Sequence, residues 1–172
     1  MKKIINFGIY ALSTSLFLFS CGNASQDKQT DHDHSAHQVT AEQPKAASTN
    51  AIVVESNDQM KFDTEEIRVK AGENVHLTLK HVGTMAKEVM GHNFVILKPG
   101  TDVMAFAAAA INAKDSEYIP ASESASIIAH TKLIGGGEET SIDFTLQEPG
   151  KYEYVCSFPG HVAIMKGVII AE

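Results

Sequence analysis

Hydrophobic and polar residues alternate along several stretches between residues 51 and 172. Successive side chains of a β-strand point to opposite faces, so a period of two residues is typical of strands with one buried face. Turn-forming sequences separate the stretches: AGEN at 71–74, KPG at 98–100, GGG at 135–137 and EPG at 148–150. The apolar positions of the clearest runs are Ile67 and Val69; Val75, Leu77 and Leu79; and Ile142, Phe144 and Leu146. The pattern therefore predicts an all-β domain.

One stretch departs from this alternation. Residues 103–114 read VMAFAAAAINAK, and their alanine-rich centre has high helix propensity. We therefore expect one short helical insertion at this position. Many short strands, regularly spaced turns and one helix together favour a Greek-key β-sandwich, in a domain that spans residues 51–172.

The first 20 residues have the pattern of an export signal. Two lysines at positions 2 and 3 precede an apolar run that is too short to span a membrane as a helix. The run ends in LFSC at residues 18–21, which resembles a bacterial lipobox. This resemblance implies cleavage before Cys21 and attachment of lipid to it; a plain secretory signal cut nearby is the alternative. In either case we expect the protein to leave the cytoplasm, and the lipid would anchor it to a bacterial membrane in the periplasm or cell envelope.

Residues 22–50 contain one large aliphatic residue, Val39, and no aromatic residue. Such a segment buries too little apolar surface to offset the entropy lost on ordering. We therefore expect residues 21–50 to form a flexible tether that starts at the lipidated Cys21. The tether includes His32, His34 and His37, within DHDHSAH. These histidines are either a loose metal-capture site or polar linker residues without a metal function.

The chain is acidic, with a formal net charge of −7, and removal of residues 1–20, which carry two lysines and no acidic residue, leaves −9. Phosphate binding requires a basic surface, so nucleic acid is excluded as an expected partner. Docking onto an anionic lipid surface is also disfavoured, except through the lipid anchor. A partner with a basic or apolar docking face fits better, and we expect the domain itself to be monomeric.

The chain has two cysteines, and lipidation of Cys21 would leave Cys156 without a disulfide partner. An unpaired thiol in an oxidising compartment is either buried and inert or bound to a metal. His161 and Met165 follow Cys156 in the run CSFPGHVAIMKG. Two histidines, one cysteine and a distant methionine form a copper site of the electron-transfer type, and His92, in VMGHNFVIL, is the candidate for the second histidine. The sequence thus predicts one copper ion that cycles between Cu(I) and Cu(II).

Three other histidines fall within the domain. His81 shares parity with the apolar residues of 75–79, so we expect it in the core. His76 has the opposite parity and His130 lies close to a lysine, so we expect both at the surface.

Four segments resemble azurins and occur in the azurin order: NDQMKFD, VMGHNFVIL, IIAHTKLIG and CSFPGHVAIMKG. The resemblance covers about residues 52–172, and the Cys-x4-His-x3-Met spacing is similar to that of azurins rather than plastocyanins. It implies a cupredoxin-like sandwich of about eight strands with one type 1, or blue, copper. It also implies that the azurin counterpart of His81 lies near the copper.

The resemblance also assigns roles to residues by matching motif. It implies that His92, Cys156 and His161 are the strong copper ligands, and that Met165 is the weak axial ligand, opposite the backbone carbonyl of Gly91. The residues expected around these ligands are Asn93, which would tie the two ligand loops together, Ser157 and Phe158. The residues expected to form an exposed apolar patch for electron transfer, around a solvent-exposed edge of His161, are Met60, Met90, Phe158, Pro159, Val162 and Ala163.

The sequence departs from the azurin pattern at two points. Phe94 stands where azurins usually have tryptophan, and the domain lacks the cysteines for a disulfide near its start. The resemblance implies an electron carrier, not an enzyme, with c-type cytochromes or copper-containing terminal reductases or oxidases as transient partners. One alternative is a copper-capture or copper-delivery protein that uses the tether histidines. Another is a thiol hydrolase that uses Cys156, although nothing in the sequence marks a substrate cleft or oxyanion hole.

Overall fold

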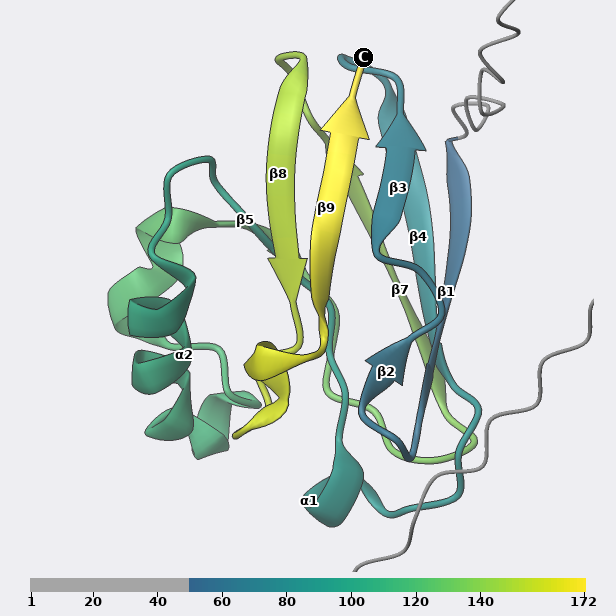
Figure 1. The fold of residues 1–172 in the computed structure, drawn as a ribbon, viewed down its shortest axis with the longest axis vertical. Helices are drawn as coiled ribbons and strands as arrows, with labels where there is room; N and C mark the ends of the chain where they lie inside the picture. The colour runs from purple at the N-terminus through teal and green to yellow at the C-terminus, as the bar shows by residue number, and fades with distance from the viewer. Residues whose placement is uncertain (1–49) are drawn as a thin grey trace, which may run out of the picture. The chain divides into compact units, whose positions relative to one another are not determined.

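The computed structural model describes residues 50–172, which form a sandwich of two β-sheets (Figure 1). One sheet has the strand order β2-β1-β4-β7, and the other has the order β3-β9-β8-β5-β6. The nine strands within this range are β1 (Ala51–Asn57), β2 (Lys61–Phe62), β3 (Glu66–Val69), β4 (Asn74–His81), β5 (Val95–Leu97), β6 (Ile127–His130), β7 (Glu139–Thr145), β8 (Gly150–Val155) and β9 (Lys166–Ala171). The expected all-β sandwich is confirmed.

Buried and outward-facing residues alternate along β4, and the buried ones pack in the core between the two sheets. Val75, Leu77 and Leu79 are completely buried, while the intervening residues face away from the core. This strand lies at the centre of its sheet, parallel to β1 and antiparallel to β7. His81 continues the buried face and is 2% exposed, so its predicted place in the core is confirmed. His76 and His130 are exposed, as expected.

Aromatic rings fill the middle of the sandwich. Phe94 is fully buried and stacks on Tyr154, with ring centroids 4.3 Å apart. Phe62 meets both rings edge-on at 5.6 and 5.7 Å. Phe94 therefore packs within a three-ring cluster. Such edge-on and offset contacts add to the stabilisation from apolar burial.

The helical content exceeds the single expected insertion. Helix α2 (Val103–Ile111) lies within residues 103–114, and the Asp102 side chain caps it by accepting from the backbone N–H groups of Met104 and Ala105. The other helical segments of residues 50–172 are α1 (Lys87–Met90) and the 3₁₀ turns η1 (Lys114–Ser116), η2 (Ala121–Ser126) and η3 (His161–Ala163). These segments have six residues or fewer, which is too short for a 3.6-residue apolar period to show in the sequence.

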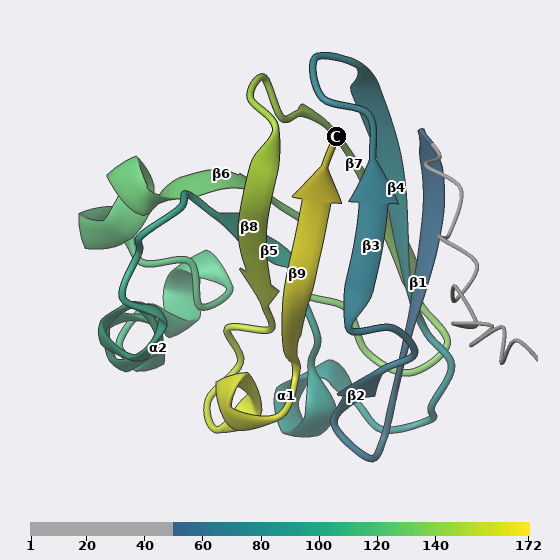
Figure 2. The ribbon, with the colours of Figure 1, turned by 45° about the horizontal axis from the view of Figure 1, so that its top comes forward.

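The helical segments occupy two places around the sandwich. Figure 2 shows α2 beside β5 and β8, and α1 at the end of the sandwich where β8 terminates. Within residues 50–172 no helix is both long enough and apolar enough to cross a membrane. The expected export signal (1–20), the lipidated Cys21 and the histidines of the tether lie outside the described residues.

Candidate metal centre

A thiol and two imidazoles meet at the end of the sandwich where β8 terminates. The Sγ atom of Cys156 lies 3.9 Å from Nδ1 of His92 and 3.6 Å from Nδ1 of His161. The candidate ligand atoms of the three residues all lie within 4.8 Å of one another. Bonds of about 2.0–2.3 Å from one ion to sulfur and nitrogen would separate such ligand atoms by about 3.5–3.8 Å. The geometry therefore suits a single shared ion.

One short loop delivers Cys156 and His161. Cys156 directly follows β8, and its backbone N–H donates to the carbonyl of Met165 at 2.9 Å. The N–H of Met165 in turn donates to the carbonyl of His161 at 2.8 Å. Gly160 makes the turn possible, because its φ of 83° lies in the left-handed region that favours glycine. These bonds hold Met165, which is fully buried, beside the other two residues of the loop.

A second loop delivers His92 and fixes the direction of its ring. The Nε2–H group donates to the backbone carbonyl of Asn57 at 2.9 Å, so the unprotonated Nδ1 faces Cys156. The backbone of His92 pairs with Ile134 in both directions, at 2.9 Å each. The carbonyl oxygen of Gly91 lies 4.0 Å from the Cys156 sulfur. A Cβ on Gly91 would lie 2.5 Å from the Lys87 carbonyl oxygen, so only glycine fits there.

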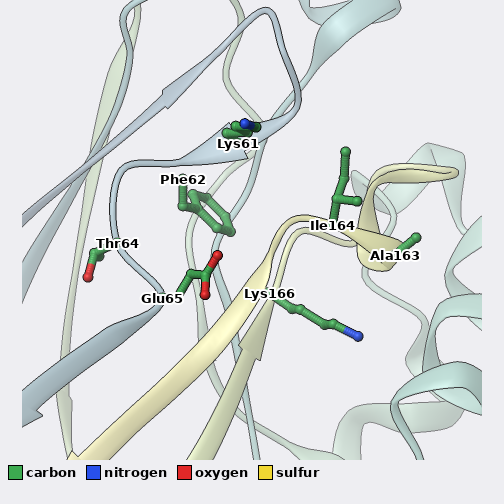
Figure 3. A pocket seen from close by; sticks show the side chains of 7 residues that line it. All are labelled: Lys61, Phe62, Thr64, Glu65, Ala163, Ile164 and Lys166. Atoms are coloured by element: carbon green, nitrogen blue, oxygen red, sulfur yellow. The ribbon is translucent and has the colours of Figure 1, made fainter. Parts of the chain in front are cut away.

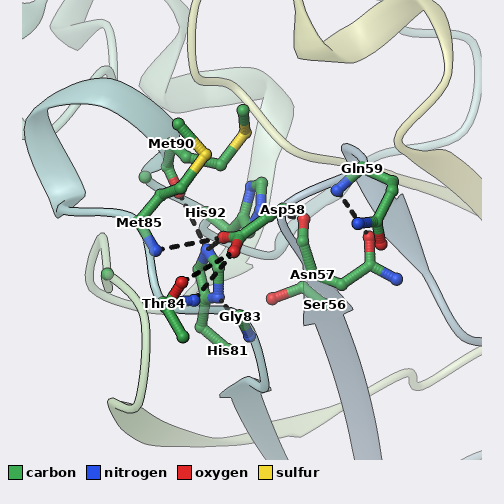
Figure 4. A network of polar contacts seen from close by, with 12 residues as sticks. Ser56, Asn57, Asp58, Gln59, His81, Gly83, Thr84, Met85, Met90 and His92 are labelled. Atoms are coloured by element: carbon green, nitrogen blue, oxygen red, sulfur yellow. Dashed lines mark hydrogen bonds and ion pairs between the residues drawn. The ribbon is translucent and has the colours of Figure 1, made fainter.

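His81 packs against the ring of His92. The two rings stack with centroids 4.4 Å apart and planes 19° apart. His81 Nε2–H donates to the carbonyl of Met90 at 2.9 Å, and its Nδ1 accepts from the N–H of Gly83 at 3.1 Å (Figure 4). Both ring nitrogens are thus satisfied by backbone groups, and the ring is fixed without a metal.

Asn93 joins the two ligand loops. Its Oδ1 accepts from the backbone N–H of Ser157 at 2.8 Å, and its Nδ2 donates to Ser157 Oγ at 2.8 Å. The same Nδ2 group donates to the carbonyl of Glu117 at 3.2 Å. Both Asn93 and Ser157 are buried, so water does not compete for these bonds. The expected tie between the loops is present in the hydrogen bonds of Asn93.

Burial sets the protonation states of the three candidate ligands. Desolvation lowers the pKa of His92 and of His161 to about 4, and the neighbouring imidazoles lower the pKa of His161 further. Desolvation also raises the pKa of the Cys156 thiol to about 11. At neutral pH the metal-free site therefore holds two neutral imidazoles and a protonated thiol. A bound metal ion has to displace only the thiol proton.

These pKa values predict acid sensitivity of the metal-free protein. An unfolded histidine titrates near 6.5, whereas His92 and His161 titrate near 4 in the folded state. Between these values the unfolded chain binds more protons, so stability is complete above pH 6.5 and falls as the pH drops towards 4. We expect the melting temperature of metal-free protein to fall steadily across this window. An unchanged melting temperature between pH 6.5 and 4.5 would contradict the assigned burial.

Exposure of the expected electron-transfer patch differs from the prediction at two residues. Val162 is only 8% exposed because it packs with Phe106 of α2 in a small second core. His161 is 3% exposed, since η3 starts at this residue and the Phe158 ring lies against the imidazole, with centroids 4.6 Å apart. Val162 and His161 are therefore less exposed than the sequence analysis expected.

The rest of the patch is accessible to differing degrees. Ala163 is exposed, and the residues of intermediate exposure are Met60, Met90, Phe158 and Pro159. Ile164, which the sequence analysis did not single out, is 54% exposed, and Met104 of α2 is 65% exposed. An apolar groove of about 290 Å³ lies between α2 and the ligand loop 157–163.

A second groove borders the other side of the ligand loop (Figure 3). It has a volume of about 430 Å³ and is lined by Lys61, Phe62, Thr64, Glu65, Ala163, Ile164 and Lys166. Its charges are mixed and it contains no histidine or cysteine. We therefore assign the chemistry to the buried thiol and imidazoles and not to this groove.

Comparison with known proteins identifies the metal. Residues 48–172 match the family of copper binding proteins described as the plastocyanin/azurin family. The chain belongs to this family. A thiol and two imidazoles suit zinc as well as copper, but the family decides for copper. The buried donors present in this azurin-like cupredoxin fit a copper ion.

Individual relatives support the same assignment. The chain is 46% identical to outer membrane protein H.8 of Neisseria meningitidis serogroup B over 126 residues, which cover 72% of this chain and 68% of that protein. It is 44% identical to the azurin of Pseudomonas fluorescens biotype C over 128 residues, covering 69% and 94%. The crystal structure of dithionite-reduced auracyanin from Roseiflexus castenholzii superposes with a TM-score of 0.66 at 35% identity, covering 73% of this chain and 99% of that one.

Proposed function

We propose that this protein carries single electrons on one copper ion held by His92, Cys156 and His161. Met165, buried in the same loop, and the carbonyl oxygen of Gly91, 4.0 Å from the sulfur of Cys156, would add weaker donors to this set. The observation that carries the proposal is the convergence of one buried sulfur and two buried imidazole nitrogens within 4.8 Å. When bound, copper supplies the one-electron change between Cu(I) and Cu(II).

The surrounding residues serve this task by keeping the site rigid. Asn57 fixes the ring of His92, and Asn93 fixes the loop that carries Cys156. Ligands held on loops of a stiff sheet scaffold keep their positions when the charge of the site changes. Burial excludes water from the ligand atoms, so the site does not have to reorganise solvent at each electron transfer.

The same burial disfavours a thiol hydrolase. Cys156 is completely buried, and its pKa is raised to about 11, so the nucleophilic thiolate is scarce in metal-free protein at neutral pH. A hydrolytic cysteine needs access to substrate and a lowered pKa. Both properties of Cys156 therefore argue against a hydrolytic role.

We propose that partners dock on the apolar surface formed by Phe158, Pro159, Ala163 and Ile164, beside the buried ligands. Small apolar interfaces suit weak, fast encounters. The formal charge of −7 favours partners with a basic or apolar docking face. We propose c-type cytochromes or copper-containing terminal reductases or oxidases as these partners.

We further propose that the protein works outside the cytoplasm, anchored through lipid on Cys21. Residues 22–50 would then serve as the tether of a copper domain that spans residues 51–172. The LFSC sequence at 18–21 supports the anchor, and the relatives named outer membrane protein H.8 support a place in the cell envelope.

Rapid mixing with a reduced c-type cytochrome tests the carrier function and the docking surface together. Oxidised copper-loaded protein is expected to accept one electron per chain. Ile164→Glu should lower the bimolecular rate constant by about tenfold or more, because a charge would be buried in the encounter complex. Val53→Glu is the matched control, since Val53 is 55% exposed on β1 and the charge change is identical.

Electron uptake tests the carrier function, and the difference in rate between the two variants tests the docking surface. No electron uptake by wild-type protein would contradict the carrier function. Equal rates for Ile164→Glu and Val53→Glu would leave that function intact and show that docking occurs elsewhere. The visible spectrum of both variants should match the wild type, because neither side chain contributes a ligand.

A further inference from the structure

The segment NDQM at residues 57–60 forms the turn between β1 and β2, yet none of its side chains is a proposed copper ligand. Its backbone has a direct role at the site. The carbonyl of Asn57 accepts from the N–H of Met60 at 3.1 Å and from His92 Nε2–H at 2.9 Å. The turn therefore has to keep its place for His92 to keep its orientation.

The Asp58 carboxylate attaches this turn to a neighbouring loop (Figure 4). One oxygen, Oδ2, accepts from the backbone N–H of Thr84 at 2.8 Å and from its hydroxyl at 3.3 Å. The other oxygen, Oδ1, accepts from the backbone N–H of Met85 at 3.2 Å and lies 3.8 Å from Nε2 of His81. Both carboxylate oxygens are thus occupied by donors from residues 81–85.

Gly83 leaves the space that this contact requires. A Cβ at position 83 would lie 2.1 Å from Asp58 Oδ1 and 2.4 Å from the carboxyl carbon. Any side chain there would push the carboxylate away from its donors. The Asp58 carboxylate therefore occupies the space that a side chain at position 83 would fill.

The loop that Asp58 holds leads directly to the proposed ligand. Residues 84 and 85 run into α1, which ends at Met90, and Gly91 and His92 follow. His92 then returns to the turn through its bond to Asn57. The turn 57–60 is thus joined to residues 84–92 at two points: the Asp58 carboxylate binds the backbone of Thr84 and Met85, and the Asn57 carbonyl binds His92.

We propose that Asp58 is a positioning residue for the copper site. Its carboxylate holds the turn 57–60 against residues 83–85, so that the Asn57 carbonyl holds His92 Nε2–H and directs Nδ1 towards Cys156. This inference rests on the proposed ligand role of His92. It gives the NDQM segment a function at the copper site, although none of its side chains is a proposed ligand.

Asp58→Asn in the full chain tests the proposal. Asparagine keeps one acceptor oxygen but turns an NH₂ group towards backbone N–H donors, so the contact between residue 58 and the backbone of residues 84 and 85 weakens. In copper-loaded protein we expect a shifted visible band, altered copper hyperfine coupling in the electron-spin spectrum and a raised reduction potential. The potential rises because a negative charge that favours the more positive, oxidised ion is removed.

A measurement on metal-free protein follows the hydrogen bond from His92 Nε2–H to the Asn57 carbonyl directly. In metal-free Asp58→Asn protein, NMR should show the His92 Nε2–H proton exchanging with water about tenfold faster, as expected when one hydrogen bond is weakened. Asp63→Asn is the matched control. Its carboxylate lies on the same hairpin and carries the same charge, but it accepts from Glu55 N–H at 3.0 Å and not from residues 83–85.

Gly83→Ala separates position from charge. It displaces the carboxylate while leaving its charge in place, so the visible band and the His92 exchange rate should change as in Asp58→Asn. Wild-type spectra and exchange in both folded variants would overturn the proposal. Failure of both variants to fold would also overturn it, because Asp58 would then serve the fold and not the site. Absence of the visible band in wild-type protein would instead overturn the proposed function.

Discussion

Cys156→Ser protein is expected to lose the intense visible absorption that copper-loaded wild-type protein shows in its oxidised form. The sulfur of Cys156 is the atom that lies 3.6 and 3.9 Å from the two imidazole nitrogens. A serine hydroxyl is a harder and far weaker ligand, so the thiolate-to-copper charge-transfer band disappears. Copper affinity should fall by more than about 100-fold, beyond the loss typical of residues that only support a ligand.

Absorption spectroscopy and a copper titration against a competing chelator measure both effects. Cys21→Ser is the control, because it removes the other cysteine of the chain, outside the described residues. This control should keep both the band and the affinity. An intense band that persists in Cys156→Ser protein would contradict the ligand assignment.

Asn93→Ala is expected to destabilise the domain and disturb the copper site together. The change leaves the backbone N–H and the hydroxyl of buried Ser157 without their hydrogen-bond partner. Each buried unsatisfied group costs about 1–3 kcal/mol, so the free energy of unfolding of metal-free protein should fall by about 2–5 kcal/mol. The visible band should also shift, because Ser157 directly follows Cys156.

Denaturant unfolding compares this variant with Asn112→Ala. Asn112 is exposed, and only its backbone N–H takes part in capping α2. The control should therefore change stability by less than about 0.5 kcal/mol, as is usual for surface substitutions. Equal losses in the two variants, or an unshifted band in Asn93→Ala, would show that Asn93 does not join the ligand loops.

Sequence predicted the strands best where one face of a strand is buried. Val75, Leu77 and Leu79 alternate with outward residues along β4, and the structure buries all three. The ligand loop was also recognisable, because a cysteine, a histidine and a methionine in one short run rarely share a purely structural role. Helix α1 was missed, since four residues with no buried side chain leave no periodic signal.

Burial at the ligand loop could not be predicted from local pattern. The run FPGHV around His161 has the composition of an exposed turn. Its burial depends on Phe158 folding over the imidazole and on Val162 reaching Phe106, which is 56 positions earlier in the chain. The support from Asn57 was equally hidden, because every residue offers a carbonyl group and only the fold decides which one meets His92.

A crystal structure of copper-loaded protein, with anomalous scattering recorded at the copper absorption edge, tests the central claim most directly. Our account predicts one copper peak per chain within residues 50–172, bonded to Cys156 Sγ and to Nδ1 of both His92 and His161. A principal peak at an exposed histidine such as His76 or His130, with none beside Cys156, would contradict it.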